Sequence, residues 1–499
     1  MNIVPGYNTI GNIGGRAYQN SNVAVTILQA RRGSVKDIIK ELGGVRDEYI
    51  ETMDQYLTPL PGISLLKILP GALKILWKQR KALHNIPVFI SQNPGWCRSQ
   101  CQRINSIQDQ AGLAQLAERE LMPYTLDSFW RTIATAWRYG ELVGKLRREL
   151  VALVGADEAD ALLSNVSSQH DFLSSLGPVI GLSRVAHGEM SRDTYLEQWG
   201  HRGPQETETS IPRAFEDPDW FDRQLKTYLQ SPINVETMLA NQRNRYNTAW
   251  KNFKLRYPRK VSTVGRRLEK TAEAIRLREA VRSELTRLVW VARTWALRAG
   301  ELLGIGDDIF FLTYDEVLGL LDGRDIATDY LRARRQTYEK YKQLPPYPLV
   351  IRGRFDPFQW ALDPNRETDA FDSHGLLPSL KVRGHSDNIV LGMPGAAGQI
   401  EGTVRRIDDP EQGDELKPGE ILVTSQTNIG WTLIFPRVVG IVTDVGAPLS
   451  HAAIVARELG IPAVVNCGDA TMQLHTGDRV RLDGANGTVE ILEKAENIA

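Results

Sequence analysis

The sequence predicts a multidomain α+β protein, in which a largely helical part of the chain precedes a compact α/β unit. Through most of the first 352 residues, apolar residues recur every three or four positions, the period of a helix packed on one side. From about residue 392 the chain changes to short β-branched runs separated by turn residues, which indicates strands. With 499 residues and 42% hydrophobic residues, the chain is long enough for more than one core.

The helical part is assigned to residues 1–352, and its clearest helices are predicted at 126–155 and 267–304. The segment 60–83 is apolar and basic with a Pro-Gly break, which favours two packed helices. A segment that lies on a membrane, or that faces a large hydrophobic molecule, is the alternative. No apolar run reaches membrane-spanning length, so no membrane-spanning helix is expected, and packed helices are favoured over contact with a membrane at residues 60–83.

Residues 353–391 are rich in Asp, Pro and Gly, which predicts an irregular linker. The compact unit is assigned to residues 392–493, followed by a tail at 494–499. Asn486-Gly487 predicts a hairpin turn near its end. Strands are expected within 398–407, 419–425, 439–445, 463–465 and 478–492.

Charge and cysteine content narrow the class of protein. Lys plus Arg and Asp plus Glu both number 60, so the basic excess typical of nucleic-acid-binding proteins is missing, and no nucleic-acid partner is expected. Three Cys residues form neither a disulfide framework nor a zinc motif, and they suit a reducing compartment. The first residues do not resemble a signal peptide. We therefore expect a cytoplasmic protein without a metal of its own.

The segment 443–465, TDVGAPLSHAAIVARELGIPAVV, contains a single histidine at a distinctive position. Ser450 is a good N-cap, a helix is predicted from His451 to Leu459, and Gly460 ends it before a buried strand. Unpaired backbone N–H groups at the first turn favour an anion and disfavour a proton on the imidazole. A neutral imidazole that carries a phosphoryl group would suit this place, and a packed or capping histidine is the alternative.

This segment, together with ILVTSQTNIGWTLIFPRVVGIV and GMPGAAGQIEGTVRRI before it, resembles the swivelling phosphohistidine domain of the phosphoenolpyruvate synthase and pyruvate phosphate dikinase superfamily. The resemblance runs from about residue 392 to 492. It implies that His451 is the phosphorylated residue, which carries a phosphoryl group between a nucleotide site and an acceptor site. It also makes Asp444, Ser450 and Arg457, which lie in the same motif, catalytic candidates.

Segments 15–20, 195–220 and 306–317 resemble the central helical domain of rifampin phosphotransferases, in which the acceptor binds. The same role is therefore expected for residues 1–352. A cluster of His, Arg and Glu could deprotonate a hydroxyl and hold phosphate oxygens. A solvated loop with structural ion pairs is the alternative. The acceptor-site candidates are His201, Arg202, Glu206, Glu208 and Arg213, and His187 is expected to be a surface or packed residue.

No segment of this sequence resembles the ATP-grasp domain of the family, so ATP and Mg²⁺ are expected on a separate ATP-grasp subunit, as in the split dikinase phenylphosphate synthase. The predicted function is a dikinase-type phosphotransferase subunit that transfers a phosphoryl group from ATP through His451 to a hydroxyl or carboxyl group of an organic acceptor. A hydrophobic acceptor is one option. A non-catalytic binding or regulatory protein, and a ligase or dehydratase component that uses a phosphorylated intermediate, are the alternatives.

The charges are unevenly distributed along the chain. Residues 243–298 contain sixteen basic and four acidic residues, whereas residues 392–499 contain eight basic and fifteen acidic residues. Opposite charges would help the compact unit dock on the helical part, and a solvated helix face is the simpler explanation.

Overall fold

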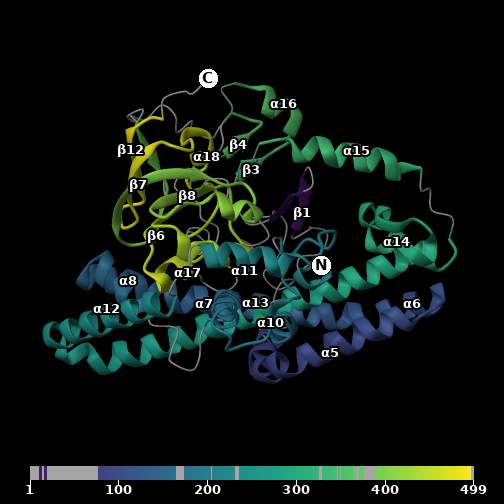
Figure 1. Cartoon of the computed structure of the whole chain (residues 1–499), viewed down its shortest axis with the longest axis horizontal. Coiled ribbons are helices and arrows are strands. Elements are labelled where there is room, and N and C mark those ends of the chain that lie inside the picture. The colour runs from purple at the N-terminus through teal and green to yellow at the C-terminus, as the bar shows by residue number, and fades with distance from the viewer. Residues whose placement is uncertain are drawn as a thin grey trace, which may run out of the picture.

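The computed structural model describes residues 10–13, 16–19, 77–164, 173–203, 205–230, 235–324, 329–345, 347–348, 350–364, 366, 370–375 and 388–495. The protein has a multidomain α+β fold. Long helices form one part of the molecule and a mixed β-sheet forms another (Figure 1). Strands β1 (Ile10–Ile13) and β2 (Arg16–Gln19) form a separate antiparallel pair.

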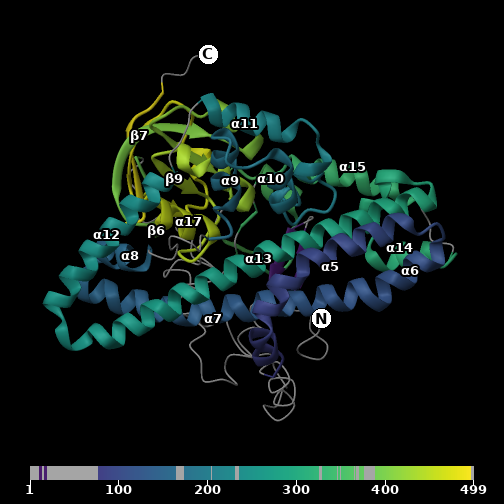
Figure 2. The ribbon, with the colours of Figure 1, turned by 60° about the horizontal axis from the view of Figure 1, so that its bottom comes forward.

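Two long helices, α7 (Met122–Val154) and α13 (Val261–Leu303), form the centre of the helical part. They match the helices predicted at 126–155 and 267–304, and Figures 1 and 2 show them side by side. Among the described residues, the other helices of this part include α5 (Ile86–Ser106), α6 (Gln110–Leu116), α8 (Ala156–Ser164), α9 (Gly177–Ala186), α10 (Arg192–Trp199), α11 (Trp220–Gln230), α12 (Val235–Arg256), α14 (Tyr314–Leu321) and α15 (Tyr330–Lys342), and residues 77–84 are also helical.

The segment between the helical part and the sheet differs from the irregular linker predicted at 353–391. It contains the short helix α16 (Pro357–Leu362), because the Asp356 side chain accepts hydrogen bonds from two N–H groups of the first turn and Pro357 suits that turn. Strand β4 (Ala370–Asp372) pairs in parallel with β3 (Val350–Arg352). The prediction of irregular chain was therefore wrong for these residues. Residues 60–76, the larger part of the apolar and basic segment, lie outside the described residues.

The compact unit is one eight-stranded sheet, with the order β5-β12-β11-β7-β8-β9-β10-β6. Strands β7 to β10 are parallel to one another, and the outer pairs are antiparallel. Strands β8 to β10 are fully buried, which explains their nearly continuous apolar sequence. The strands are β5 (Ile389–Leu391), β6 (Met393–Ala396), β7 (Gln399–Arg406), β8 (Glu420–Thr424), β9 (Gly440–Thr443), β10 (Ala463–Val465), β11 (Arg479–Asp483) and β12 (Thr488–Glu493).

The predicted hairpin joins β11 to β12, and Gly487 has a φ of 72°, which favours glycine at this turn. Strand β5 begins at Ile389, inside the segment predicted as linker, and pairs with β12. Helix α18 (Ala470–Gln473) follows β10 in the chain.

Helix α17 (His451–Leu459) connects β9 to β10, and its ends are those predicted from the sequence. The Ser450 hydroxyl accepts a hydrogen bond from the backbone N–H of Ala453, and Gly460 has a φ of 73° in the left-handed region. All nine residues of the helix are buried. Local sequence therefore determines where α17 begins and ends, and packing on several sides buries it.

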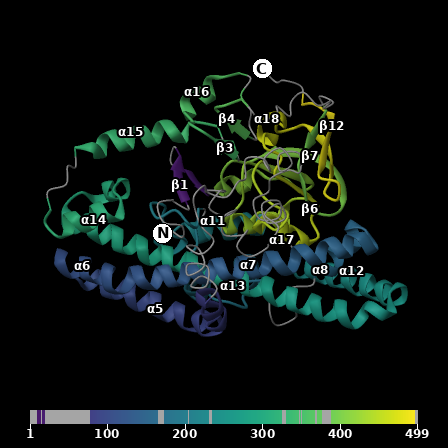
Figure 3. The same ribbon diagram turned by 180° about the vertical axis from the view of Figure 1, so that it is seen from behind.

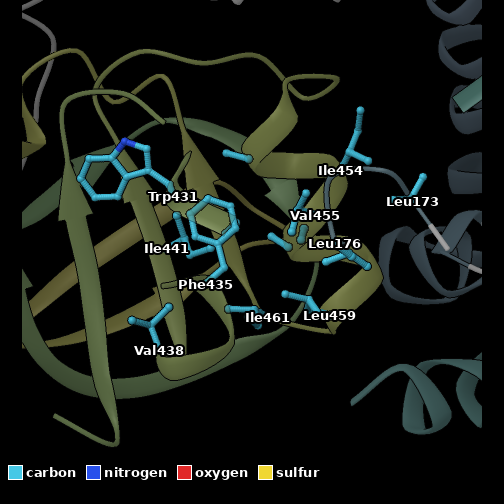
Figure 4. Packing of buried hydrophobic residues seen from close by; sticks show 14 of the residues in the cluster. Leu173, Leu176, Trp431, Phe435, Val438, Ile441, Ile454, Val455, Leu459 and Ile461 are labelled. Carbon is cyan, nitrogen blue, oxygen red and sulfur yellow. The ribbon is translucent and has the colours of Figure 1, made fainter. Parts of the chain in front are cut away.

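The sheet unit is docked on the helical part through a shared apolar cluster. Leu173 and Leu176 of the helical part lie beside Ile454 and Leu459 of α17, and the same cluster extends to Phe435 of the sheet unit (Figure 4). Helix α17 lies against α8 and α12, as the view from behind shows (Figure 3). The structure therefore shows the arrangement in which the two parts are in contact. Hydrophobic burial at about 25 cal/mol per Å² stabilises it.

Candidate functional site

His451 lies at the first turn of α17 and faces the helical part, with its side chain only 2% exposed. Its Nδ1 atom is 3.2 Å from Oε2 of Glu279 in α13, and its Nε2 atom is 3.3 Å from the Thr432 hydroxyl. If Nδ1 carries the hydrogen and donates it to the carboxylate, Nε2 keeps a lone pair. Nε2 is then the ring atom available for a covalent bond.

Sequence reasoning missed Glu279, as it missed Thr432 and Arg282, and Glu279 has no exposed surface. Its other oxygen, Oε1, pairs with Arg278. Burial alone would raise the pKa of Glu279, but the charge of Arg278 and the hydrogen bond with His451 outweigh burial and hold the pKa below its usual value. The carboxylate is therefore ionised where it meets the imidazole.

Burial also lowers the pKa of His451, and Glu279 opposes this effect only in part. The imidazole is therefore neutral near pH 7, as its position at a helix N-terminus predicted. Arg282, one turn beyond Arg278 on α13, acts electrostatically on His451 and on Glu279. The carboxylates of Glu279 and Glu206 act electrostatically on the Arg282 guanidinium group in turn.

Thr432 belongs to the 3₁₀ segment Ile429–Leu433, which the Asn428 side chain caps. Thr432 itself is completely buried. This segment is the sequence NIGWTL, where the chain differs from the usual motif of the resembled family. It nevertheless places a hydroxyl beside Nε2 of His451, where it could donate to an oxygen bound to that nitrogen.

The three residues His201, Arg202 and Glu206 are buried in the loop after α10, as a group. Arg202 donates to the carbonyl oxygen of Ser174 and to the Ser283 hydroxyl of α13, and it is 3.4 Å from Glu206 Oε1. Arg202 Nε and Glu206 Oε2 are buried without a hydrogen-bond partner in the described part of the chain. Such atoms are costly to bury unpaired, so they are available to a ligand.

Burial raises the pKa of Glu206, and the charges of Arg202, Arg282 and Arg213 oppose that rise. A carboxylate with a raised pKa is a better base once it is ionised. Burial, reinforced by neighbouring guanidinium groups, holds the pKa of His201 well below its usual value. His201 is therefore neutral near pH 7.

Two other candidates of this loop are engaged within it. Arg213 is fully buried and donates to the backbone carbonyl oxygens of Glu206 and Glu208. The Glu208 carboxylate accepts hydrogen bonds from the backbone and hydroxyl of Ser210. These contacts hold the loop in shape, and neither side chain is joined to His451.

A small pocket, partly open to solvent and with a cavity volume of about 30 Å³, lies between the helical part and the sheet unit. Leu433 follows Thr432 directly, so this pocket comes within one residue of the group beside His451 Nε2. Its walls combine aromatic and aliphatic side chains with the charged groups of Arg202 and Glu206. The helical part contributes Trp199, Trp220, Arg202 and Glu206, and the sheet unit contributes Leu433 and Ile434.

The remaining candidates of the His451 motif do not meet the imidazole. The Asp444 carboxylate accepts hydrogen bonds from the backbone N–H and the hydroxyl of Thr471, at the start of α18, instead of acting on His451. Arg457 donates to the carbonyl oxygens of Gly395 and Pro448. Ser450 is the N-cap described above. In this arrangement the three side chains hold elements together, whereas Glu279 and Thr432 contact the ring.

His187 is exposed and contacts the carbonyl oxygen of Ser183 at the end of α9, in line with the surface position expected for it. The three Cys residues are buried and free. Within the described ranges, no cluster of three His, Cys, Asp or Glu residues is arranged to hold a metal ion. Helices in those ranges also lack the length and apolar character that would be needed to cross a membrane.

Comparison with known proteins adds to this geometry. Residues 416–487, which include His451, Thr432 and the 3₁₀ segment, match the family described as "PEP-utilising enzyme, mobile domain". The chain carries the mobile domain of the PEP-utilising enzymes. The expected superfamily is thereby confirmed.

Among its relatives, the prodigiosin synthesizing transferase PigC of Serratia marcescens is 32% identical over 60% of this chain and 33% of its own length. A rifampicin phosphotransferase of Streptomyces sviceus is 32% identical over 40% of this chain and 21% of its own length. A solved structure of Enzyme I is 38% identical over 16% of this chain and 32% of that chain, with a TM-score of 0.15, so this likeness is one of sequence alone. The chain spans a third or less of the length of the curated relatives it matches. It is related to phosphotransferases of the PEP-utilising superfamily.

Proposed function

We propose that this protein is a phosphotransferase component in which Nε2 of His451 carries a phosphoryl group to a hydroxyl or carboxyl group of an organic acceptor. The contact of His451 Nδ1 with the buried Glu279 carboxylate is the observation that carries this proposal. A purely structural histidine has no need of an ionised buried carboxylate and an arginine beside it, because burying charges is costly. The proposal includes ATP and Mg²⁺ as the ultimate source of the phosphoryl group, bound by a separate ATP-grasp subunit.

Glu279 assists the transfer through the imidazole. In phosphohistidine, the bond between Nε2 and phosphorus breaks most easily when Nδ1 is protonated, because the electron pair then returns to Nε2 of a neutral ring. An ionised carboxylate at 3.2 Å stabilises the proton on Nδ1. After transfer the proton stays on Nδ1, and the ring returns to the neutral form with a free lone pair on Nε2. Glu279 itself gains and loses no proton.

The acceptor binds at the pocket between the two parts, which must widen to admit it, and there the unpaired Glu206 Oε2 atom lies among apolar walls. When the acceptor is a hydroxyl, its oxygen bonds to phosphorus as the bond to Nε2 breaks, and its proton passes to Glu206, which acts as the general base; a carboxylate acceptor has no proton to transfer. Arg282 and the Thr432 hydroxyl bind the phosphoryl oxygens, whose charge they offset. Phosphoryl transfer demands mainly positioning and charge stabilisation, and these residues supply both. The aromatic walls favour an acceptor with a flat, apolar body.

The test is mass spectrometry of the full chain isolated at alkaline pH from its native cells, in parallel with two variants. We expect a phosphoryl-sized mass on the peptide that contains His451. The His451→Asn variant should lose it, and the His187→Asn variant, changed at an exposed histidine, should keep it. If wild-type chain never carries this mass, even after incubation with ATP, Mg²⁺ and a cognate ATP-grasp chain, the proposal fails and a binding role takes its place.

A further inference from the structure

Asp160 is a buried carboxylate of α8 that lies at the contact between the helical part and the sheet unit. Its side chain is 6% exposed. Oδ1 accepts a hydrogen bond from Arg147 of α7 and is 3.5 Å from Nε of Arg457 in α17. Oδ2 accepts a hydrogen bond from the backbone N–H of Ala397, after β6. One carboxylate therefore joins the helical part to two separate elements of the sheet unit.

A second polar contact lies beside it. Gln242 of α12 donates from Nε2 to the backbone carbonyl oxygen of Arg457 at 2.6 Å. Its side chain also lies against Gly460, where an added Cβ would come within 2.9 Å of it. Arg457 follows His451 by six residues on α17, about 9 Å along the helix axis at 1.5 Å per residue. These contacts are therefore separate from the phosphoryl site but belong to the same rigid helix.

The charges make this contact specific to the docked arrangement. Arg147 and Arg457 approach the same carboxylate, so Asp160 offsets two positive charges that would otherwise repel each other. Burial alone would raise the pKa of Asp160, but these two guanidinium groups outweigh burial and lower it. If the sheet unit moves away, Asp160 keeps Arg147, whereas Arg457 and the Ala397 N–H must find other partners.

We propose that Asp160, with Gln242, is a positioning residue that latches the sheet unit onto the helical part and so sets the fraction of time that His451 faces Glu279. This inference rests on the proposed function, because a carrier must also leave Glu279 to receive its phosphoryl group. Removing one member of a buried charge cluster is costly when its partners stay buried. Neutralising Asp160 therefore disfavours the docked arrangement while the helical part keeps its own packing.

The experiment measures how fast diethyl pyrocarbonate modifies His451 in the full-length chain, read by mass spectrometry of the peptide that contains it. His451 is buried when docked, so its modification rate follows the undocked population. Asp160→Asn should raise this rate by at least about tenfold, the population change that corresponds to about 1.4 kcal/mol. Gln242→Ala, which leaves the Arg147 pair intact, should raise it by a smaller factor. Asp157→Asn removes the same charge from an exposed position of α8 and should leave the rate unchanged.

Cys97 lies in an apolar cluster of the helical part and reports general unfolding through the reaction rate of its thiol. An Asp160→Asn chain that exposes His451 while Cys97 stays protected supports the latch. If neither Asp160→Asn nor Gln242→Ala changes the His451 rate by more than twofold, the latch is refuted. If Asp160→Asn exposes Cys97 as well, the variant is generally unfolded, and the His451 modification rate of Gln242→Ala then decides whether the latch exists. The two proposals can fail separately. If both variants change the His451 modification rate as expected but the chain never carries a phosphoryl group on His451, the latch stands and the proposed function is refuted.

Discussion

Glu279→Gln tests the assigned role of the buried carboxylate without changing the size of the side chain. A hydrogen bond to a charged group contributes about 1.5–3 kcal/mol, and one between neutral groups about 0.5–1.5 kcal/mol. The variant therefore loses about 1–2 kcal/mol of stabilisation of the protonated Nδ1, which corresponds to a transfer slower by about 5- to 30-fold. Both partners are at most 2% exposed, so little solvent screening reduces this effect.

The assay needs no knowledge of the acceptor, because water can take its place. The full chain is phosphorylated on His451 with phosphoramidate, and the loss of the phosphohistidine signal is followed by ³¹P NMR at pH 8. We expect a longer lifetime in Glu279→Gln than in wild type. Glu273→Gln, an exposed change on the same helix, should match wild type. In urea, which unfolds the chain, wild type and Glu279→Gln should have equal phosphohistidine lifetimes, which would show that the difference depends on the folded structure. A Glu279→Gln lifetime equal to or shorter than that of wild type in the native chain would refute the reasoning.

Three further predictions concern stability. Burial raises the pKa of Asp444 to about 7, so the folded state binds more protons than the unfolded state between about pH 4 and 7, and this group lowers stability as pH rises. Asp444→Asn should therefore gain stability relative to wild type across that range in urea unfolding, and a difference independent of pH would contradict this. The lowered pKa of His201 means that the unfolded chain binds its proton first as pH falls below 6.5, so wild type loses stability there. His201→Gln should reduce the loss of unfolding free energy as pH falls below 6.5. An unchanged dependence of the unfolding free energy on pH would contradict this role of His201. Phe435→Ala should reduce the free energy of unfolding by about 3–5 kcal/mol, because Phe435 is fully buried. Leu362→Ala, at a residue 77% exposed, is its control, and equal effects would argue against the core position.

The sheet unit could be predicted from the sequence because its signals are local. The ends of α17 follow from Ser450 and Gly460, and the last hairpin follows from Asn486-Gly487. The long helices α7 and α13 follow from their apolar period. Helix α16 was missed because its signal, Asp356 before Pro357, covers only one turn in a segment that otherwise reads as irregular.

Half of the candidate site could not be predicted, because Glu279 is 172 residues from His451 in the sequence. Nothing local marks a glutamate whose partner belongs to another part of the chain. One signal was present: Glu279 is one of only four acidic residues among sixteen basic ones at 243–298. In this arrangement Asp444 bonds to Thr471 and not to His451, because closeness in sequence does not imply contact when a turn separates two residues. In general, short spacing predicts the shape of an element, and only packing decides which elements meet.

Helix α17 has no face in contact with solvent, and this has a consequence for handling the protein. A helix that exposes an apolar face to solvent makes its protein more prone to associate with other molecules. Whenever the sheet unit separates from the helical part, side chains such as Ile454 and Leu459 lose their cover. Molecules in which the sheet unit has separated will therefore be short-lived, or they will associate with other apolar surfaces. Dilute buffers without other apolar surfaces should favour recapture by the same chain, and hydrophobic dyes should report each release event.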